Sequence, residues 1–346
     1  MWPELFTIPF VDFPLRAFGL LVATGFLVGV SVGSKLAGKY GSDLKNDPEN
    51  FADVSWWVLI GVILGARIGF VLVNAEHYMA NPGDILKIWE GGLVMYGGLI
   101  GAITLGMIKA KKLGMHKWQT LDYGITAGFL GQAIGRLGCL AVGDDFGAPT
   151  DLPWAITFPD PLPQGSAFPI ELSTVPVHPT QLYMSAKALS LFFLGKWLLK
   201  TKRFHGQVSA ILLMAYAVLR YIIEFFRFDM VARGGIYKDG HTPEDVTAYW
   251  QELGIANEFG RITDVAKYRE MLISGAENMA PQLLMSTSQM VGIVMFSVGL
   301  ILLLWMRKIP HPPHDVRCRC LVLLAAVRPH LSIVPPRRQP MDGVGQ

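Results

Sequence analysis

The chain has 346 residues, of which 51% are hydrophobic and only 16% are charged, and its mean hydropathy is +0.38. Soluble domains contain about 25% charged residues, so this composition argues against a soluble protein. The formal net charge of +3 is small, and no basic stretch is interleaved with stacking aromatic residues, so we expect no nucleic-acid partner.

The apolar residues are gathered into long blocks. A helix needs roughly 20 mostly apolar residues to cross a bilayer. We therefore predict an all-α polytopic membrane protein with about seven spanning helices. No cleavable signal peptide is evident ahead of the first block, so we expect this block to remain as the first helix. The blocks lie at 15–37, 54–73, 92–108, 121–142, 182–199, 207–226 and 289–306.

Lysine and arginine residues gather in the segments that follow the odd-numbered blocks. Because basic residues in short loops favour the cytoplasmic side, the N-terminus is expected outside and the C-terminus in the cytoplasm. The loop at 143–181, after the fourth block, has neither Lys nor Arg and is expected outside. The basic residues concerned are Lys35, Lys39, Lys45, Lys109, Lys111, Lys112, Lys117, Lys200, Lys202, Arg203, Arg307 and Lys308.

Residues 228–285 are expected to form a small outer head within a membrane domain that spans 1–309. Thr242, followed by Pro243 and two acidic residues, is a good helix start. A second short helix is predicted to begin at Thr263 and to end near Gly275.

The tail at 310–346 is rich in Pro and Arg, and we expect it to be disordered on the cytoplasmic side. Its apolar run at 320–327 is too short to span a bilayer. We find no internal sequence repeat, which weakens the interpretation as a repeat-built transporter.

Ionisable residues inside spanning helices are functional candidates because they are costly to insert. Arg67, Arg136, Arg220 and Glu224 stand out. Arg220 and Glu224 are four residues apart and face the same side of a helix, and Tyr216 and Arg227 extend this stripe. Such a stripe suits a phosphate, since the arginine fork matches phosphate oxygens. The alternative is that these charges pair with one another and only hold the bundle together.

Three further clusters carry polar or small residues near the ends of predicted helices. In the stretch 135–147, a helix breaks into a glycine-rich acidic loop, and the alternative is an ordinary loop in water. The glycines of 96–101 would also be explained by close helix packing. In the stretch 178–183, the histidine is equally expected as a polar loop residue, and Thr180 as a helix cap.

Taken in order, these motifs resemble the bacterial phosphatidylglycerol–prolipoprotein diacylglyceryl transferase family, over roughly residues 15–308. The resemblance implies transfer of a diacylglyceryl group from phosphatidylglycerol to the lipobox cysteine thiol of a prolipoprotein signal peptide. It also implies a multi-pass protein of the bacterial inner membrane that needs no cofactor or metal. The matching stretches are Gly65 to Phe70, Tyr96 to Gly101, Gly135 to Gly147, His178 to Tyr183, Arg220 to Arg227 and, more weakly, Ser286 to Gln289.

The resemblance also assigns roles to individual residues. Arg136 and Arg220 are expected to bind the lipid phosphate. The residues expected to take part in the chemistry are Arg136, Arg220, Tyr96, His178 and Asp144. Those expected to bind or orient the substrate are Arg67, Gly97, Gly98, Cys139, Gly147, Gln181, Tyr216, Glu224 and Arg227.

The chain departs from the family pattern at five positions. The family usually has histidine where this chain has Tyr96, and a tyrosine is a poor base at neutral pH. His178 and Asp144 are then the candidates for the proton acceptor, and the rival hypothesis is a lipid- or lipoprotein-binding paralogue without activity. The other departures are Phe18 for tyrosine, Cys139 for asparagine, Asp144 for glutamate and Met184 for glutamate.

Overall fold

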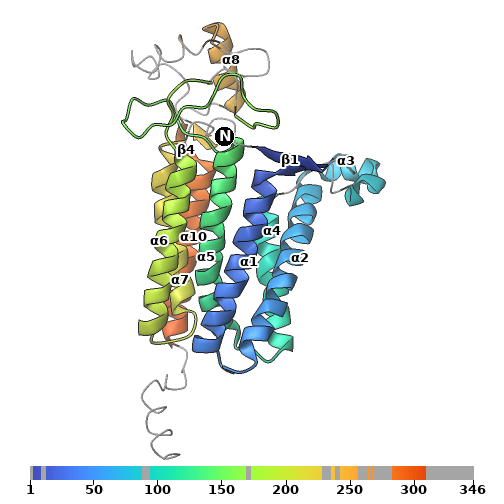
Figure 1. Cartoon of the computed structure of the whole chain (residues 1–346), viewed down its shortest axis with the longest axis vertical. Coiled ribbons are helices and arrows are strands. Elements are labelled where there is room, and N and C mark those ends of the chain that lie inside the picture. Colours follow the sequence, from blue (N-terminus) through green and yellow to red (C-terminus); the bar gives the residue numbers. More distant parts are fainter. Residues whose placement is uncertain are drawn as a thin grey trace, which may run out of the picture. The chain divides into compact units, whose positions relative to one another are not determined.

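Seven long helices form the core of the computed structural model (Figure 1). They are α1 (Ala17–Tyr40), α2 (Asp47–Val73), α4 (Met95–Lys112), α5 (Lys117–Val142), α6 (Thr180–Thr201), α7 (Gln207–Glu224) and α10 (Thr287–Lys308). The structure describes residues 3–8, 13–87, 94–168, 173–227, 235–237, 242–255, 264, 267 and 283–308. The predicted tail lies outside these residues, and the chain divides by its contacts into Met1–Ile309 and Pro310–Gln346.

Each predicted block corresponds to one helix, but the helices run beyond the apolar residues. For example, α2 begins at Asp47 rather than near residue 54. Pro48 in its first turn, with Asp47 and Glu49 beside the positive helix end, explains this start. Conversely, α7 ends at Glu224, so Arg227 follows the helix instead of lying on its stripe.

Six of the described helices are long and apolar enough to cross a membrane: α1, α2, α5, α6, α7 and α10. Of the seven long helices, α4 is not in this set, and it carries three lysines in its last turn. Large apolar side chains point outwards from the bundle, such as Leu72 on α2, Phe193 on α6 and Ile301 on α10, as a lipid environment requires. The prediction of an all-α polytopic membrane protein is confirmed.

Glycine lets the helices pack in close pairs. A methyl group at Gly65 of α2 would lie 2.3 Å from the carbonyl oxygen of Gly97 on α4. One at Gly25 of α1 would lie 2.6 Å from the carbonyl oxygen of Gly131 on α5. Since the backbones themselves are in contact, α2 pairs with α4 and α1 with α5.

A buried carboxylate fixes the turn between α6 and α7. Asp122 of α5 is fully buried and accepts hydrogen bonds from Lys202 Nζ (3.0 Å) and from the amides of Gly206 and Ser209 (2.9 Å each). Its charge is therefore compensated, and α5, α6 and α7 are held together at this end.

Short elements that the sequence analysis did not predict occupy the connections. Helix α3 (Ala75–Ala80) and the 3-10 helix η1 (Pro82–Leu86) follow α2. Strands β1 (Glu4–Ile8) and β2 (Phe13–Arg16) pair antiparallel, as do β3 (Gly235–Tyr237) and β4 (Leu283–Ser286).

In the expected head, α8 (Pro243–Glu252) begins as predicted at Thr242. The Thr242 hydroxyl and the Asp245 carboxylate form a reciprocal capping box with the backbone amides of the first turn. The predicted second helix, from Thr263 to Gly275, lies outside the described residues apart from Asp264 and Lys267. Helix α3, which follows α2, and the loop that follows α5 lie at the same end of the bundle (Figure 1).

The alternation of basic and non-basic loops predicts which exposed residues face the outside. Gln164 and Ser42 are both exposed and lie in loops expected on opposite sides. In intact cells, a cysteine at Gln164 should react with a membrane-impermeant thiol reagent, whereas the near-isosteric Ser42→Cys should react only after the membrane is opened. The unaltered chain is the control for its native cysteines, and the reverse labelling pattern would overturn the orientation.

Candidate functional site

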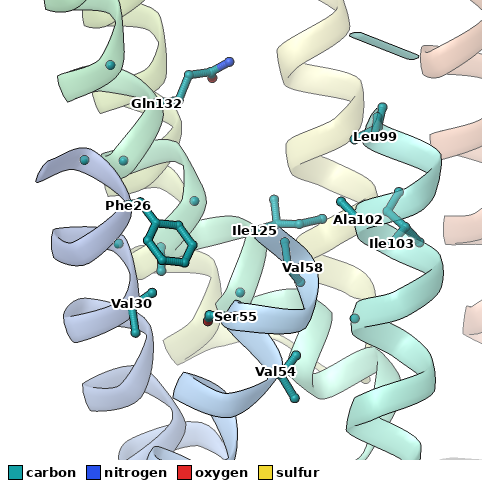
Figure 2. Close-up of a pocket in the computed structure, with 18 of the residues that line it drawn as sticks. Phe26, Val30, Val54, Ser55, Val58, Leu99, Ala102, Ile103, Ile125 and Gln132 are labelled. Atoms are coloured by element: carbon teal, nitrogen blue, oxygen red, sulfur yellow. The ribbon is translucent and has the colours of Figure 1, made fainter. Parts of the chain in front are cut away.

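An apolar groove of about 790 Å³ runs between α1, α2, α4 and α5. It forms because α1 packs on α5 and α2 on α4, while α4 and α5 touch little. Both Lys117 and Arg136 of α5 line it, and at 1.5 Å per residue this is a length of about 28 Å. Figure 2 shows lining residues from each wall, namely Phe26, Val30, Val54, Ser55, Val58, Leu99, Ala102, Ile103, Ile125 and Gln132.

At one end the groove is lined by Arg136 and Asp145, and Asp145 joins Arg136 to a second arginine, Arg227. Arg136, on α5, and Arg227, which follows α7, both pair with Asp145. The side chain of Arg227 is almost completely buried, and that of Asp145 is largely buried. Such a cluster at bilayer depth is a binding site for an anion or a structural tie between segments.

Local backbone geometry explains why Asp145, and not Asp144, points at the arginines. Helix α5 ends at Gly143 in the left-handed conformation (φ 81°), and Asp145 is also left-handed (φ 57°). Asp tolerates this conformation better than most residues. The chain therefore doubles back on α5, and Asp145 faces Arg136. Asp144, the predicted residue, is exposed, and its carboxylate accepts a hydrogen bond from the amide of Asp145 (2.8 Å).

The acidic loop is held by the start of α6. The Thr180 hydroxyl donates to the carbonyl oxygen of Asp145 (2.5 Å), and Gln181 Nε2 donates to that of Asp144 (2.8 Å). Gln181 is fully buried, and within the described part of the chain its Oε1 has no hydrogen-bond partner. Gln181 therefore keeps one acceptor available at the site.

Gly147 lets three segments meet. It forms a β-bridge with Arg227, and a methyl group there would lie 2.5 Å from Cβ of His178 and 2.8 Å from the carbonyl oxygen of Phe226. Close packing therefore requires glycine at this position, and its role in substrate binding stays a prediction. His178 stands beside it, with Nδ1 3.3 Å from the Tyr183 hydroxyl. Burial lowers the pKa of His178 below its ordinary value, so its imidazole is neutral at pH 7.

A second charged cluster joins α7 to α10. Arg220 pairs with Glu224, as the four-residue spacing suggested, and its other guanidinium nitrogen donates to Ser288 Oγ (3.1 Å). Glu224 is fully buried and accepts from Ser286 Oγ (2.9 Å). Ser286 and Gln289 form reciprocal hydrogen bonds that cap α10, which positions both serines.

Sequence reasoning missed Lys187. This residue of α6 is only 5% exposed, and its ammonium lies 3.9 Å from the ring centroid of Tyr216. Arg220, Arg136 and Arg227 are close enough to repel it. The signal in the sequence was a lysine in the middle of an apolar block, which the survey of ionisable residues passed over. Tyr216 itself also stacks on Phe129 of α5 (centroids 5.9 Å apart).

Several residues that were predicted to bind substrate make packing contacts and are not among the residues that line the groove. Arg67 donates to the carbonyl oxygens of Ile85 (2.9 Å) and Asp84 (2.6 Å), and so anchors η1 to α2. A methyl group at Gly97 or Gly98 would contact a carbonyl oxygen of α2. The side chain of Tyr96 lies outside the described residues, although its backbone belongs to α4.

Cys139 contributes to the mouth of the groove. Its sulfur and the carboxylate oxygens of Asp144 and Asp145 lie within 4.8 Å of one another. Because Asp145 is already paired with two guanidinium groups, the local field opposes a further cation. We therefore do not regard this group as a metal centre.

An apolar groove that reaches a partly buried arginine between membrane-spanning helices is typical of an integral membrane protein that binds an anionic lipid. Comparison with known proteins identifies the family. The family model described as prolipoprotein diacylglyceryl transferase matches residues 3–305 of the chain, and the chain therefore belongs to this family.

Curated relatives named phosphatidylglycerol–prolipoprotein diacylglyceryl transferase are similar over most of their length. The chain is 35% identical to the Bordetella bronchiseptica protein over 212 residues, which are 61% of this chain and 77% of the relative. It is 34% identical to the Thermosynechococcus vestitus protein over 222 residues, 64% of this chain and 80% of the relative. The Finegoldia magna protein is also 34% identical, over 63% of this chain and 82% of the relative.

The two neighbouring aspartates provide a matched test of the charge cluster. Asp145→Asn leaves Arg136 and Arg227 without their shared carboxylate, and should lower stability by about 3 kcal/mol. Asp144→Asn changes an exposed group and should cost no more than about 0.5 kcal/mol. Thermal unfolding of both variants in detergent measures the difference. Equal losses would show that the pairing of Asp145 contributes nothing to stability.

Proposed function

We propose that the chain transfers a diacylglyceryl group from phosphatidylglycerol to the lipobox cysteine of a prolipoprotein, and that the reaction occurs where the groove meets Arg136. The observation that carries this assignment is the position of Arg136, paired with Asp145, at the end of an apolar groove. Acyl chains would occupy the apolar walls, and the phosphate would lie among the guanidinium groups.

The reaction is a displacement at carbon. The thiolate sulfur of the prolipoprotein attacks the carbon of the diacylglyceryl group that bears the phosphate, a C–S bond forms, and the bond between that carbon and the phosphate oxygen breaks. The electron pair stays on the phosphate oxygen, and glycerol phosphate leaves. Negative charge therefore develops on the departing phosphate, and fixed cations in a dry site stabilise it most.

Arg136 and Arg220 are the proposed phosphate ligands. Each already has a carboxylate partner, Asp145 for Arg136 and Glu224 for Arg220. These carboxylates orient the two guanidinium groups. A guanidinium has five N–H donors, so a single carboxylate does not saturate it. Gln181, with its available acceptor oxygen, is suited to a hydroxyl of the lipid head group.

His178 is the proposed acceptor of the thiol proton. Its neutral imidazole is a free base at pH 7, whereas a tyrosine such as Tyr96 has none until it ionises near pH 10. Tyr96 is then proposed to position the lipid through its hydroxyl. The arginines nearby favour the thiolate form of the incoming cysteine.

The proposed setting is the bacterial inner membrane, with the N-terminus outside and the C-terminus in the cytoplasm. The acidic loop and the arginine cluster then lie at the outer side, where the cysteine of a secreted prolipoprotein arrives. The apolar part of its signal peptide would approach from the bilayer.

Removal of a phosphate ligand should abolish most of the activity. Arg136→Ala should slow transfer by about 100- to 1,000-fold, equivalent to about 2–4 kcal/mol of barrier stabilisation. Arg220→Ala should slow transfer to a similar extent. Because it also leaves the buried carboxylate of Glu224 without its arginine partner, the amount of this variant in the membrane must be measured. Arg→Lys at either position keeps the charge, loses the fork and should still lower the rate.

The assay is the mass of a lipobox peptide incubated with phosphatidylglycerol. Arg203→Ala, which changes an exposed arginine away from the groove, is the control. Unimpaired transfer by both alanine variants would show that these arginines only hold the bundle together. Absence of transfer by the unaltered protein would favour the paralogue without activity.

The pH dependence of the rate distinguishes the two candidate bases. A base acts in its deprotonated form, and the pKa of His178 is lowered, so the rate should fall only below about pH 6.5 and stay level above pH 7. His178→Ala should lower the rate more than Tyr96→Phe and remove the acidic inflection, and Tyr96→His should be tolerated or faster. A rate that climbs to about pH 10 and is lost in Tyr96→Phe would make Tyr96 the base.

A further inference from the structure

We propose that Lys187 is a further phosphate-binding residue, whose buried ammonium contacts the phosphate group alongside the arginines. The inference rests on the proposed function, in which Arg136 and Arg220 hold the lipid phosphate. It adds a cation from α6, a helix to which no phosphate ligand has been assigned so far.

Lys187 is buried at the place where α5, α6 and α7 meet. Its ammonium lies over the ring of Tyr216 from α7 at 3.9 Å. Among the residues that the structure describes, no carboxylate pairs with it, and the charged groups that act on it are Arg220, Arg136 and Arg227. A cation is therefore held among three other cations, with only an aromatic face as a partner.

The balance of charge in this region favours an anionic ligand. Four cations, from Lys187 and the three arginines, lie in this region with two carboxylates, the largely buried one of Asp145 and the fully buried one of Glu224. The third carboxylate, of Asp144, is exposed to solvent. A buried uncompensated cation costs several kcal/mol, and an apolar side chain of similar length would fill the same space without this cost. An anion that enters the cluster removes the penalty.

Phosphate is the anion that fits the reaction. The phosphodiester of phosphatidylglycerol has one negative charge, and the phosphomonoester that leaves carries up to two. A further cation therefore interacts more strongly with the departing phosphate than with the substrate. An interaction that strengthens as the reaction proceeds lowers the barrier to transfer. Lysine suits this role as a compact point charge, while the arginines supply directional forks.

Thermal unfolding of the whole protein in detergent tests phosphate binding without the reaction. Lys187→Met keeps the stem and removes the charge, Lys187→Arg keeps the charge, and Lys187→Gln is a second neutral variant in case the first does not fold. Lys196→Met is the matched control, since Lys196 is exposed on the same helix. The probes are glycerol phosphate, phosphatidylglycerol in mixed micelles, and uncharged diacylglycerol in the same micelles.

Both phosphate probes should raise the unfolding temperature of the unaltered protein and of Lys187→Arg and Lys196→Met, because a ligand stabilises the state that it binds. The rise in unfolding temperature caused by the phosphate probes should be at least halved in Lys187→Met and Lys187→Gln. The effect of diacylglycerol on the unfolding temperature should be the same in these variants as in the unaltered protein. Without ligand, Lys187→Met should unfold at the same or a higher temperature than the unaltered protein. A purely structural role for the ammonium predicts the opposite, a lower unfolding temperature and an unchanged response to phosphate.

The transfer assay separates this inference from the proposed function. Lys187→Met should lower kcat by about 10-fold with a smaller change in KM, and Lys187→Arg should recover most of it. If the unaltered protein does not transfer the diacylglyceryl group, the proposed function fails, and the unfolding measurement still decides on Lys187. An equal phosphate response in the neutral variants and the unaltered protein, or no response in any of them, overturns the inference.

Discussion

The structure depends on the compensation of positive charge at bilayer depth. An unpaired cation at bilayer depth is costly, and Asp145 compensates the charges of two arginines, Arg136 and Arg227. To do so it must leave α5, turn back through two left-handed residues and be clamped by Thr180. The acidic loop, the start of α6 and the end of α7 are thus joined because one carboxylate has to meet two guanidinium groups.

Close packing of the helices creates the apolar part of the site. Glycine contacts draw α2 onto α4 and α1 onto α5, with backbones touching at Gly65 and Gly97 and at Gly25 and Gly131. The two pairs meet less closely, and the groove lies between them. The glycines that pack the helices into pairs therefore also leave an apolar groove between the pairs. This groove suits the apolar part of an amphiphile.

The charged part of the site is built from segments far apart in the chain. Arg136 belongs to α5, Lys187 to α6 and Arg220 to α7, while Ser286 ends β4 and Ser288 lies in the first turn of α10. Each contributes a polar group at the same end of the bundle. A phosphate bound there would be surrounded by cations from three helices, with its apolar chains in the groove, and this separation of charge from apolar surface matches the two ends of a phospholipid.

The sequence by itself determined the membrane class and the number and approximate place of the long helices, because apolar blocks of sufficient length leave few alternatives. It also indicated the pairing of Arg220 with Glu224, since a spacing of four residues is local on a helix. Only the tertiary structure decided that Asp145 rather than Asp144 meets the arginines, that Arg67, Gly97 and Gly98 serve packing, and that Lys187 lies among the cations. The physical reason is that these contacts depend on the rotation of each helix about its axis and on the left-handed turn after α5, and neither is fixed by the spacing of residues along the chain.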